Sequence, residues 1–552
     1  MNDRASANDC TVLIAGAGPA GLSLAADLGR RGISCLVIEK RTRFTQHPRA
    51  TLLGARSMEY FRQFGIADTV LKAGLPTHYR YDVVFATRAA GKLLYHYASP
   101  SPDEYAEMAE GTRPPTVDSL STPYFKVQIG QHALEPILKA HAESLDGVEV
   151  RYGTELLDFG QVDGGVEVLI RDVATGDERQ VRASYLAACD GGRSIVRAKL
   201  EIPYTGRGAM RRNVSFLFRA PDFLDHATVG RGNLTFLFSP GNFGVFTQID
   251  DAGTWNYQHY CLDDDSDDIA DPEAEIRAAL SSDCPIEVLR TMKWSHHQSV
   301  ADRFRSGRIF LLGDSAHLFC PTCGIGMNTA IGDAFDLGWK IAAVEAGWGG
   351  PALLDSYEEE RRPIAFRNTL AAAANADRID SVMATIPANI DDDTPEGERA
   401  RELLKPRFRW LSKQFNSNGT HLGYRYADSS IVVADGTPEP PDDPRIVVQS
   451  TWPGVRAPHL WVDKGLSTLD LIDPRGFTLM LTGEGTTTDA APVCDAAAER
   501  GIPLHVVRVE GEAAAALYGL PLVLVRPDGH VAWRGAALPE DIGALLDIIS
   551  GQ

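Results

Sequence analysis

The chain contains 552 residues, which at about 150 residues per domain indicates three or four folded units. Hydrophobic residues make up 44% and charged residues 23%, the proportions of an ordinary globular protein, so disorder is excluded as its main property. The 54 Lys and Arg residues against 74 Asp and Glu residues give a net charge of −20, which argues against nucleic acid or an anionic membrane as the principal partner.

The N-terminal region has the pattern of a strand–helix–strand unit. An apolar run, Thr11–Ala15, leads into the glycine motif Gly16-Ala-Gly-Pro-Ala-Gly21, and a helical pattern follows over 22–30. A second apolar run begins at Cys35 and ends at Glu39. Short apolar strands that alternate with helical patterns are typical of a parallel α/β sheet.

The glycines and the acid in this unit suit a dinucleotide. Gly16 permits the tight turn after the strand, Gly18 lets the backbone approach a pyrophosphate, and Gly21 allows the helix to pack closely on the strand. The helix N-terminus attracts the negative charge of the phosphates. Glu39, eighteen residues after Gly21, can bind a free ribose diol. The unit therefore predicts a site for FAD or NAD rather than for a 2′-phosphorylated ligand.

The middle of the chain combines a turn motif with a run of aromatic strands. Asp190-Gly191 follows the apolar segment Tyr185–Cys189 and marks a turn. Aromatic and β-branched segments, interrupted by Gly, Pro and Asp turns, occupy 213–262. This composition predicts an antiparallel sheet inserted into the α/β domain.

A second strand–loop–helix motif follows residue 307. The apolar run Ile309–Leu312 precedes Gly313-Asp314, a glycine-containing loop, and a predicted helix over 329–345. An Asp at the end of a buried strand can hold a polyol hydroxyl, and the loop glycines let the backbone approach a flat ring. The helix N-terminus at Met327–Asn328 directs partial positive charge toward that ring.

Two loops mark boundaries in the last third of the chain. Residues 386–398 are acidic and contain Pro, and residues 435–444 are rich in Pro and Gly. Residues 445–552 then alternate strand and helix patterns in the order βαβαββα. This order predicts a separate C-terminal α/β unit.

These motifs occur in the order and at the spacing of one enzyme family. The chain resembles the FAD-dependent aromatic hydroxylases of the para-hydroxybenzoate hydroxylase type, which are single-component flavoprotein monooxygenases. The resemblance covers residues 8–375 and includes Pro48-Arg-Ala50 and Gln131-His-Ala-Leu-Glu-Pro136. It extends to the branch of phenol and polyketide hydroxylases, including those resembling 2,4-dichlorophenol 6-monooxygenase, which carry a thioredoxin-like C-terminal domain. Residues 445–552 fit that domain, and their single cysteine, Cys494, predicts no dithiol redox role.

The resemblance implies an α/β fold in several parts. A discontinuous Rossmann-like FAD-binding domain is expected over 1–80, 111–200 and 300–385. An antiparallel β-sheet substrate domain is expected as an insertion over 81–110 and 201–299. A helical linker region over 386–444 then leads to the thioredoxin-like domain over 445–552.

The resemblance also implies which residues bind the cofactors, FAD and a transient NADPH or NADH. The first motif would wrap the pyrophosphate and adenosine ribose of FAD through Gly16, Gly18, Pro19, Ala20, Gly21, Glu39 and the adjacent Lys40. Arg49 and Gln131 would lie against FAD, and Asp314 would bind its ribityl chain. Gly326, Met327 and Asn328 would face the pyrimidine edge of the flavin. Asp190 and Gly191 would serve both the flavin and the nicotinamide donor.

The implied reaction has two halves. NADPH or NADH reduces FAD, and O2 then forms a flavin C4a-hydroperoxide that hydroxylates a phenolic ring, either in natural-product tailoring or in phenol catabolism. Three alternatives stay open: a Baeyer–Villiger-type oxygenase on the same fold, a flavin-dependent dehydrogenase or electron-transfer protein without oxygen insertion, and a non-catalytic scaffold. The aromatic sheet argues against an electron-transfer protein, which needs no enclosed aryl pocket.

The aromatic strands supply the candidates for substrate binding, although such aromatic rows are more often core. Those predicted to contact an apolar phenol are Phe216, Phe236, Phe238 and Phe246, together with Pro321 of the flavin loop. The candidates to contact the phenolic hydroxyl and act in catalysis are His259, Gln248 and Tyr257. Phenol hydroxylases of this branch use an Asp near the position of Thr51, so the catalytic base stays open between a histidine, a water relay and no base at all.

Two further patterns invite a functional reading. His317, Cys320 and Cys323 form an H-x2-C-x2-C pattern, but no fourth ligand is nearby, so we expect no metal site. Cys323 also stands where the family commonly has glycine. The pair His296-His297 is expected at the end of an element rather than at a catalytic centre.

The sequence also bears on location and partners. No apolar run reaches about 18 residues, so no membrane span is predicted. The polar segment Met1–Cys10 lacks the apolar core of a signal peptide, and eight scattered cysteines are typical of a reduced chain. We expect a cytoplasmic enzyme that forms a homo-oligomer and has a small phenolic substrate and O2 as partners.

Overall fold

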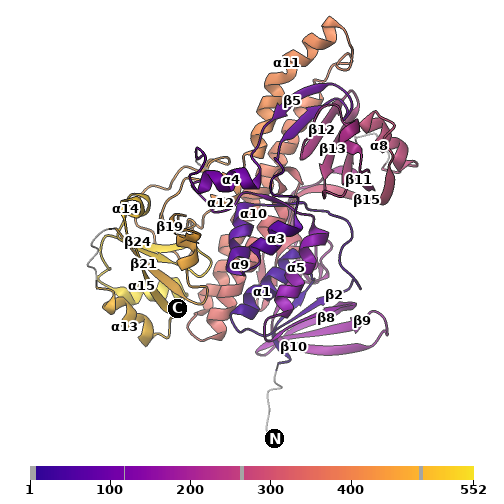
Figure 1. Cartoon of the computed structure of the whole chain (residues 1–552). Coiled ribbons are helices and arrows are strands. Elements are labelled where there is room, and N and C mark those ends of the chain that lie inside the picture. Colours follow the sequence, from indigo (N-terminus) through magenta and orange to yellow (C-terminus); the bar gives the residue numbers. More distant parts are fainter. Residues whose placement is uncertain (1–7, 117–118, 262–266, 484–488) are drawn as a thin grey trace.

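The computed structural model describes residues 8–116, 119–261, 267–483 and 489–552, and it shows three parts that each contain a sheet (Figure 1). The first and second sheets have eight strands each, and the C-terminal sheet has four. The predicted α/β fold with an inserted sheet is confirmed.

The first sheet is mostly parallel. Its strands are, in order, β16 (Arg305–Ser306), β17 (Ile309–Leu311), β10 (Glu178–Ala188), β1 (Cys10–Ala15), β2 (Cys35–Glu39) and β7 (Val148–Tyr152). The antiparallel hairpin of β8 (Thr154–Val162) and β9 (Gly165–Asp172) extends it from β10. Because β1 pairs in parallel with both β2 and β10, the predicted strand–helix–strand unit is present.

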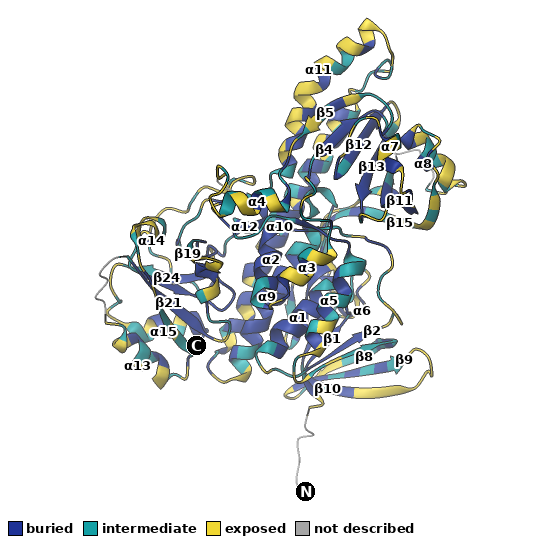
Figure 2. Cartoon of the chain, in the orientation of Figure 1, coloured by how far each residue is buried: buried dark blue, intermediate teal, exposed yellow. Residues whose placement is uncertain are grey.

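Helices pack on this sheet and on one another. α1 (Pro19–Arg30) packs against α5 (Gln131–Glu143) and α9 (Gly326–Glu345), and α9 packs against the long α10 (Pro351–Met383). The shorter helices are α2 (Ala55–Gln63), α3 (Ala67–Ala73), α4 (Pro102–Ala109) and α6 (Ile195–Lys199), and β3 (Leu52–Leu53) pairs with β6 (Val127–Gln128). Figure 2 shows α1 and α9 largely buried, which fits two helices that are apolar on most sides.

The second sheet contains the aromatic strands. Its order is β18 (His317–Leu318), β15 (Glu287–Ala301), β11 (Tyr204–Arg219), β14 (Thr254–Tyr260), β13 (Asn242–Gln248), β12 (Leu234–Ser239), β4 (Val83–Ala86) and β5 (Leu93–Tyr97). The pairs formed by β11 to β14 are antiparallel, as predicted, whereas β12 and β4 pair in parallel. The long strand β15 was not predicted and places His296 inside a strand, so the expectation that His296-His297 ends an element is wrong.

Side chains of the second sheet alternate between two covered faces. The face packed under α8 (Pro272–Leu280) and α7 (Phe223–His226) is called the α8 face. The opposite face, packed against α10 and α11 (Pro395–Ser412), is called the α10 face. Because paired strand residues point to the same face, the register assigns every strand side chain to one of the two.

The C-terminal part follows the predicted order of strands and helices. β21 (Phe477–Thr482) pairs in parallel with β22 (Leu504–Val509) and antiparallel with β23 (Leu522–Val525), which pairs with β24 (Val531–Gly535). The helices are α13 (Ala491–Glu499), α14 (Glu512–Tyr518) and α15 (Ile542–Ser550). The part of the chain between α11 and β21 is called the connecting segment. It holds α12 (Asn418–Leu422) and the short pair β19 (Trp461–Asp463) and β20 (Leu466–Ser467).

Buried charges join the C-terminal part to the first part. Arg456 lies 2.6 Å from Glu59 of α2, and Arg526, which is fully buried, pairs with Glu360 of α10. Such pairs are costly to break once desolvated, so the C-terminal part is firmly docked. None of the helices in the described part of the chain combines the length and apolar character needed to span a bilayer.

Candidate active site

The turn between β1 and α1 forms a cradle with open space at one position. A side chain at Gly16, where φ is +110°, would place its Cβ 2.2 Å from the Cys189 carbonyl oxygen, and one at Gly21 would lie 2.0 Å from the Gly16 oxygen. At Gly18, by contrast, no described atom lies within 4 Å of that point. Pro19 and Ala20 open α1, and no described side chain caps its N-terminus. The free N–H groups of this first turn therefore suit a pyrophosphate.

Glu39 ends β2 beside this cradle. Its Oε2 accepts a hydrogen bond from the Ala17 N–H at 3.2 Å, and its Oε1 accepts from Arg41 N at 2.9 Å and Nε at 3.0 Å. Burial alone would raise the pKa of this carboxyl, but the bonds to Arg41 and Ala17 outweigh it and lower the pKa. Arg41 Nη2 also donates to Oε2 at 3.2 Å, so the roughly four acceptor positions of the carboxylate are all used, and a ribose hydroxyl would have to displace one of the Arg41 bonds. Lys40 is exposed next to it.

Two carboxylates, Asp190 and Asp314, stand at the ends of neighbouring strands. Asp190 follows β10, and its Oδ1 is buried without a hydrogen-bond partner in the described structure, next to Gly191 with φ +83°. Asp314 lies after β17 and is exposed. Because β10 and β17 pair in parallel, their carboxyl ends lie at one edge of the sheet. Buried acceptors without a donor indicate a ligand that supplies one.

The loop before α9 is held by side chains rather than open. Asn328 Oδ1 accepts from Gly54 N and Ser57 Oγ, both at 2.7 Å, and its Nδ2 donates to the carbonyls of Leu52 and Gly324. All the polar atoms of the Asn328 side chain are thus used within the protein. Only the backbone of Gly326, Met327 and Asn328, at the N-terminus of α9, is free to face a flavin, and Met327 is half-buried.

A hydrogen-bonded chain links the segment around Arg49 to the second sheet. His47 Nδ1 accepts from the Arg49 N–H at 3.2 Å, and its Nε2 lies 3.2 Å from Ser215 Oγ, which donates to Asn256 Oδ1 at 2.7 Å. Burial and the charge of Arg49 lower the pKa of His47 to about 4, so this imidazole is neutral. Gln131 opens α5 nearby, and its backbone N–H donates to the carbonyls of Pro48 and Ala50.

The predicted catalytic side chains lie together on the α8 face. Tyr257 is fully buried against Phe246, and His259 Nδ1 lies 2.9 Å from Glu275 Oε1 of α8. Gln248 points to the same side, where it accepts from Arg231 and donates to the Asp250 carbonyl. Ser215, which meets His47, points to the opposite side. The three candidates are therefore separated from the loop around Arg49 by the thickness of the sheet.

The predicted substrate residues divide between the two faces. Phe216 and Phe246 pack with Tyr257 on the α8 face. Phe236 and Phe238 are on the α10 face, where Phe238 meets Phe408 of α11 with ring centroids 5.1 Å apart. All four are core residues, whereas Pro321 is half-exposed in the loop that precedes α9.

A cavity on the α10 face lies beside that loop. Its wall combines side chains of β11, β14 and β15 with the loop residue Thr322 and with α10, and includes Met210, Arg211, Tyr260, His296, Thr322 and Ile379. His296 is 3% exposed and stacks on Trp294 with ring centroids 4.9 Å apart. Its Nε2 has no hydrogen-bond partner among the described residues. From the sequence, no role in the site was predicted for His296. The burial pattern of β15 shows that its side chain is covered, but the polar residues of this strand hide that pattern in the sequence.

The H-x2-C-x2-C side chains point to three separate partners. His317 Nε2 lies 2.6 Å from Asp333, Cys320 Sγ lies 3.4 Å from the Met210 sulfur, and Cys323 Sγ is near Asn375. No group of three or more His, Cys, Asp or Glu side chains within the described ranges is arranged to hold a metal. Cys323 has φ +66°, the left-handed conformation that explains why glycine suits this position.

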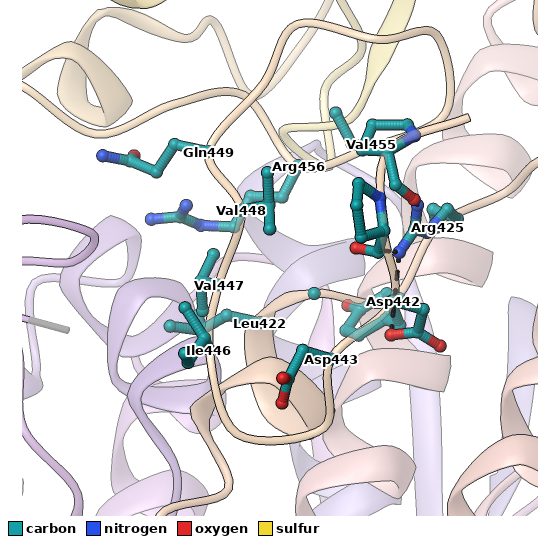
Figure 3. A pocket seen from close by; sticks show the side chains of 14 residues that line it. Leu422, Arg425, Asp442, Asp443, Ile446, Val447, Val448, Gln449, Val455 and Arg456 are labelled. Atoms are coloured by element: carbon teal, nitrogen blue, oxygen red, sulfur yellow. Dashed lines mark hydrogen bonds and ion pairs between the residues drawn. The ribbon is translucent and has the colours of Figure 1, made fainter. Parts of the chain in front are cut away.

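A second cavity lies in the connecting segment, between Leu422 and Arg456 (Figure 3). Figure 3 shows Arg425 and Asp442 directed at each other. Arg425 lies 3.6 Å from Asp442 and 3.3 Å from Glu439. Arg456 is paired with Glu59. The cations of this cavity are already neutralised and no predicted site residue lines it, so we assign it to packing of the connecting segment.

Comparison with known proteins identifies the chain. Residues 9–372 match the family described as FAD binding domain, and residues 450–552 match the family described as aromatic-ring hydroxylase, C-terminal. The FAD-dependent monooxygenase apdD of Emericella nidulans is 32% identical over 92% of this chain and 85% of its own length. Phenol 2-monooxygenase of a Pseudomonas species is 31% identical over 96% of this chain and 91% of its own length.

The solved structures agree with these relatives. The rebeccamycin biosynthetic enzyme RebC with reduced flavin superimposes with a TM-score of 0.87 at 37% identity, covering 98% of this chain and 99% of that chain. The open cradle, the partnerless Asp190 oxygen and the fold together define a flavoprotein that binds FAD. The chain belongs to the family of FAD-dependent aromatic-ring hydroxylases, which are monooxygenases that use NAD(P)H.

Proposed function

We propose that the enzyme hydroxylates a phenolic ring held in the cavity on the α10 face. The observation that carries this proposal is the composition of the cavity wall, which joins Thr322 of the flavin loop to His296 and Tyr260 of the inserted sheet. A ring in this cavity would therefore lie between the cofactor loop and the sheet. The register of β15 also supports the proposal, because it directs the His296 side chain, whose Nε2 has no partner among the described residues, toward this face.

We assign each part of FAD to particular residues. The cradle of Gly16 to Gly21 would hold the pyrophosphate, Glu39 the adenosine ribose, and Asp314 the ribityl chain, with Asp190 accepting a hydrogen bond through its partnerless Oδ1. Bound FAD supplies the activation of O2 for transfer to the ring. The N-terminus of α9 would direct partial positive charge at the flavin pyrimidine edge and so stabilise its reduced, anionic form.

The polar groups of the cavity suit a phenol. Burial lowers the pKa of His296 to about 3, with help from the charges of Arg211 and His297, so the imidazole is neutral at physiological pH. A neutral ring accepts a hydrogen bond at one nitrogen, and we assign that role toward the substrate hydroxyl to His296. Arg211, which is paired with Asp380, also lines this cavity together with that carboxylate.

Three further proposals concern O2, the location of the enzyme and its oligomeric state. We propose that O2 enters as co-substrate and that the enzyme acts in the cytoplasm, where its eight free cysteines would stay reduced. Homo-oligomer formation stays a prediction, which light scattering of the purified protein tests.

The test of this function is turnover by the FAD-loaded enzyme across a panel of phenols, from single rings to fused polycyclic phenols. NAD(P)H oxidation, product mass and peroxide release are recorded together. We expect at least one phenol to accelerate NAD(P)H oxidation and to gain one oxygen atom. If every phenol leaves the oxidation rate unchanged and peroxide is the sole product, the proposal is wrong.

A further inference from the structure

A buried carboxylate lies directly beneath the strand end that carries Asp314. Asp333, on α9, is fully buried. Its Oδ2 accepts a hydrogen bond from the Gly313 N–H at 3.1 Å and lies 2.6 Å from His317 Nε2, while its Oδ1 accepts from Arg361 Nε at 2.8 Å. One carboxylate therefore binds the residues on both sides of Asp314.

We propose that Asp333 is a positioning residue for FAD, which fixes the loop Gly313–His317 so that the Asp314 carboxylate meets the ribityl chain. The inference rests on the placement of Asp314 in the FAD site and goes beyond it, because Asp333 would act there through the loop that it binds.

The loop needs such an anchor because its backbone is unusual. Gly313 has φ +61°, and its buried N–H is directed at Asp333. Removing the acceptor would leave a buried donor unpaired and free the turn to move. The loop is also packed from two sides, since a Cβ at Gly313 would lie 3.1 Å from Ala330 and 3.3 Å from Ala20. A small shift of Gly313 is therefore transmitted to Asp314 rather than absorbed by empty space.

Arg361 offsets the cost of burying the Asp333 carboxylate by pairing with it. Burial alone would raise the pKa of Asp333, but the charges of His317 and Arg361 outweigh it and hold that pKa below its ordinary value. Arg361 is itself fixed, because Nη2 donates to the Thr329 carbonyl and Nη1 to the Tyr426 hydroxyl, both at 3.1 Å. Asp333 is thus held in place by an arginine that is itself fixed, as a positioning role requires.

The test compares Asp333→Asn with Asp336→Asn, and FAD with ADP, which lacks the ribityl and flavin groups. Asp336 is a matched control because it lies one turn further along α9, is equally buried and pairs with Lys340 and Arg526 rather than with the loop. Deflavinated protein is titrated with each ligand. We expect Asp333→Asn to weaken FAD binding by about tenfold and ADP binding by less than about twofold, as expected for one lost hydrogen bond to a charged group. Asp336→Asn should leave both affinities unchanged.

His317→Gln provides a second variant that keeps the Asp333–Arg361 pair and carries the test if Asp333→Asn does not fold. It should also weaken FAD selectively and alter the visible circular dichroism of bound FAD. The proposal is overturned if a folded variant binds FAD as tightly as the wild type, or if FAD and ADP affinities fall equally. Since no turnover is measured, a failure of the proposed hydroxylation leaves these outcomes unaffected.

Discussion

At the scale of single residues, two histidines on opposite faces of one sheet have different surroundings. His259 and His296 are both nearly or fully covered and both lie on strands, yet His259 meets Glu275 of α8 and His296 lines the cavity beside Thr322. The imidazole is chemically the same in both places. Its surroundings differ, and only those of His296 include the cofactor loop.

Exchanging each histidine for leucine therefore separates the two faces. We expect His296→Leu to lower kcat/KM for the accepted phenol by about tenfold or more, the effect of losing one hydrogen bond in a desolvated site. His259→Leu, the matched control, should change kcat/KM by less than about threefold. Steady-state kinetics on the FAD-loaded variants make the comparison, and equal losses in both would place the substrate elsewhere.

Glycine variants of the cradle distinguish cofactor binding from folding. In Gly18→Val the new side chain enters space that no described protein atom occupies, so the protein should fold but lose FAD. In Gly21→Val the new side chain meets the Gly16 carbonyl at 2.0 Å, so the folded yield itself should fall. Far-UV circular dichroism and the flavin absorbance of purified protein report the two effects. Full flavin content in Gly18→Val would show that the cradle holds another ligand.

At the scale of elements, the sequence predicts the strand–helix–strand unit, the aromatic strands and the C-terminal order, because each has a clear apolar period. It does not predict β15, because three consecutive exposed residues, Leu289, Arg290 and Thr291, interrupt any apolar period in the N-terminal half of that strand. It also cannot say which face of the inserted sheet meets the cofactor. A period of two separates Phe216 from Ser215 but assigns neither to a face, and that choice depends on where α8 and α10 pack.

At the scale of the whole molecule, the C-terminal part is docked through Arg526, which lies between Glu360, Asp336 and Asp528 with no exposed surface. Arg526→Met removes the cation paired with Asp528 and one of the two cations paired with Glu360 and Asp336, so we expect the free energy of unfolding to fall by about 3–5 kcal/mol. The control, Arg500→Met, removes the partly exposed pair with Asp547 and should leave the free energy of unfolding nearly unchanged. Urea unfolding measures both. Equal, small losses would mean that the two parts are not coupled through Arg526.

Buried histidines make the whole fold sensitive to acid. Burial lowers the pKa values of His47, His421 and His530 to about 4, whereas the unfolded chain titrates near 6.5. Between these pH values the unfolded state binds more protons than the folded state. The contribution of these histidines to the free energy of unfolding is therefore fully present above about pH 6.5 and is lost as the pH falls toward 4. Thermal unfolding at pH 7.5, 6.5, 5.5 and 4.5 should show Tm falling steadily below 6.5. A Tm that is constant across that range would contradict the neutral, buried state of these rings.

The central claim is that FAD and the cavity beside Thr322 together insert one atom of O2 into a phenolic ring. The most direct measurement is turnover of an accepted phenol under isotopically labelled O2, with mass spectrometry of the product. We predict that the product carries one labelled oxygen on its ring and that His296→Leu lowers this incorporation while His259→Leu does not. A product that takes its oxygen from water, or substrate oxidation without any oxygen gained, would contradict the account.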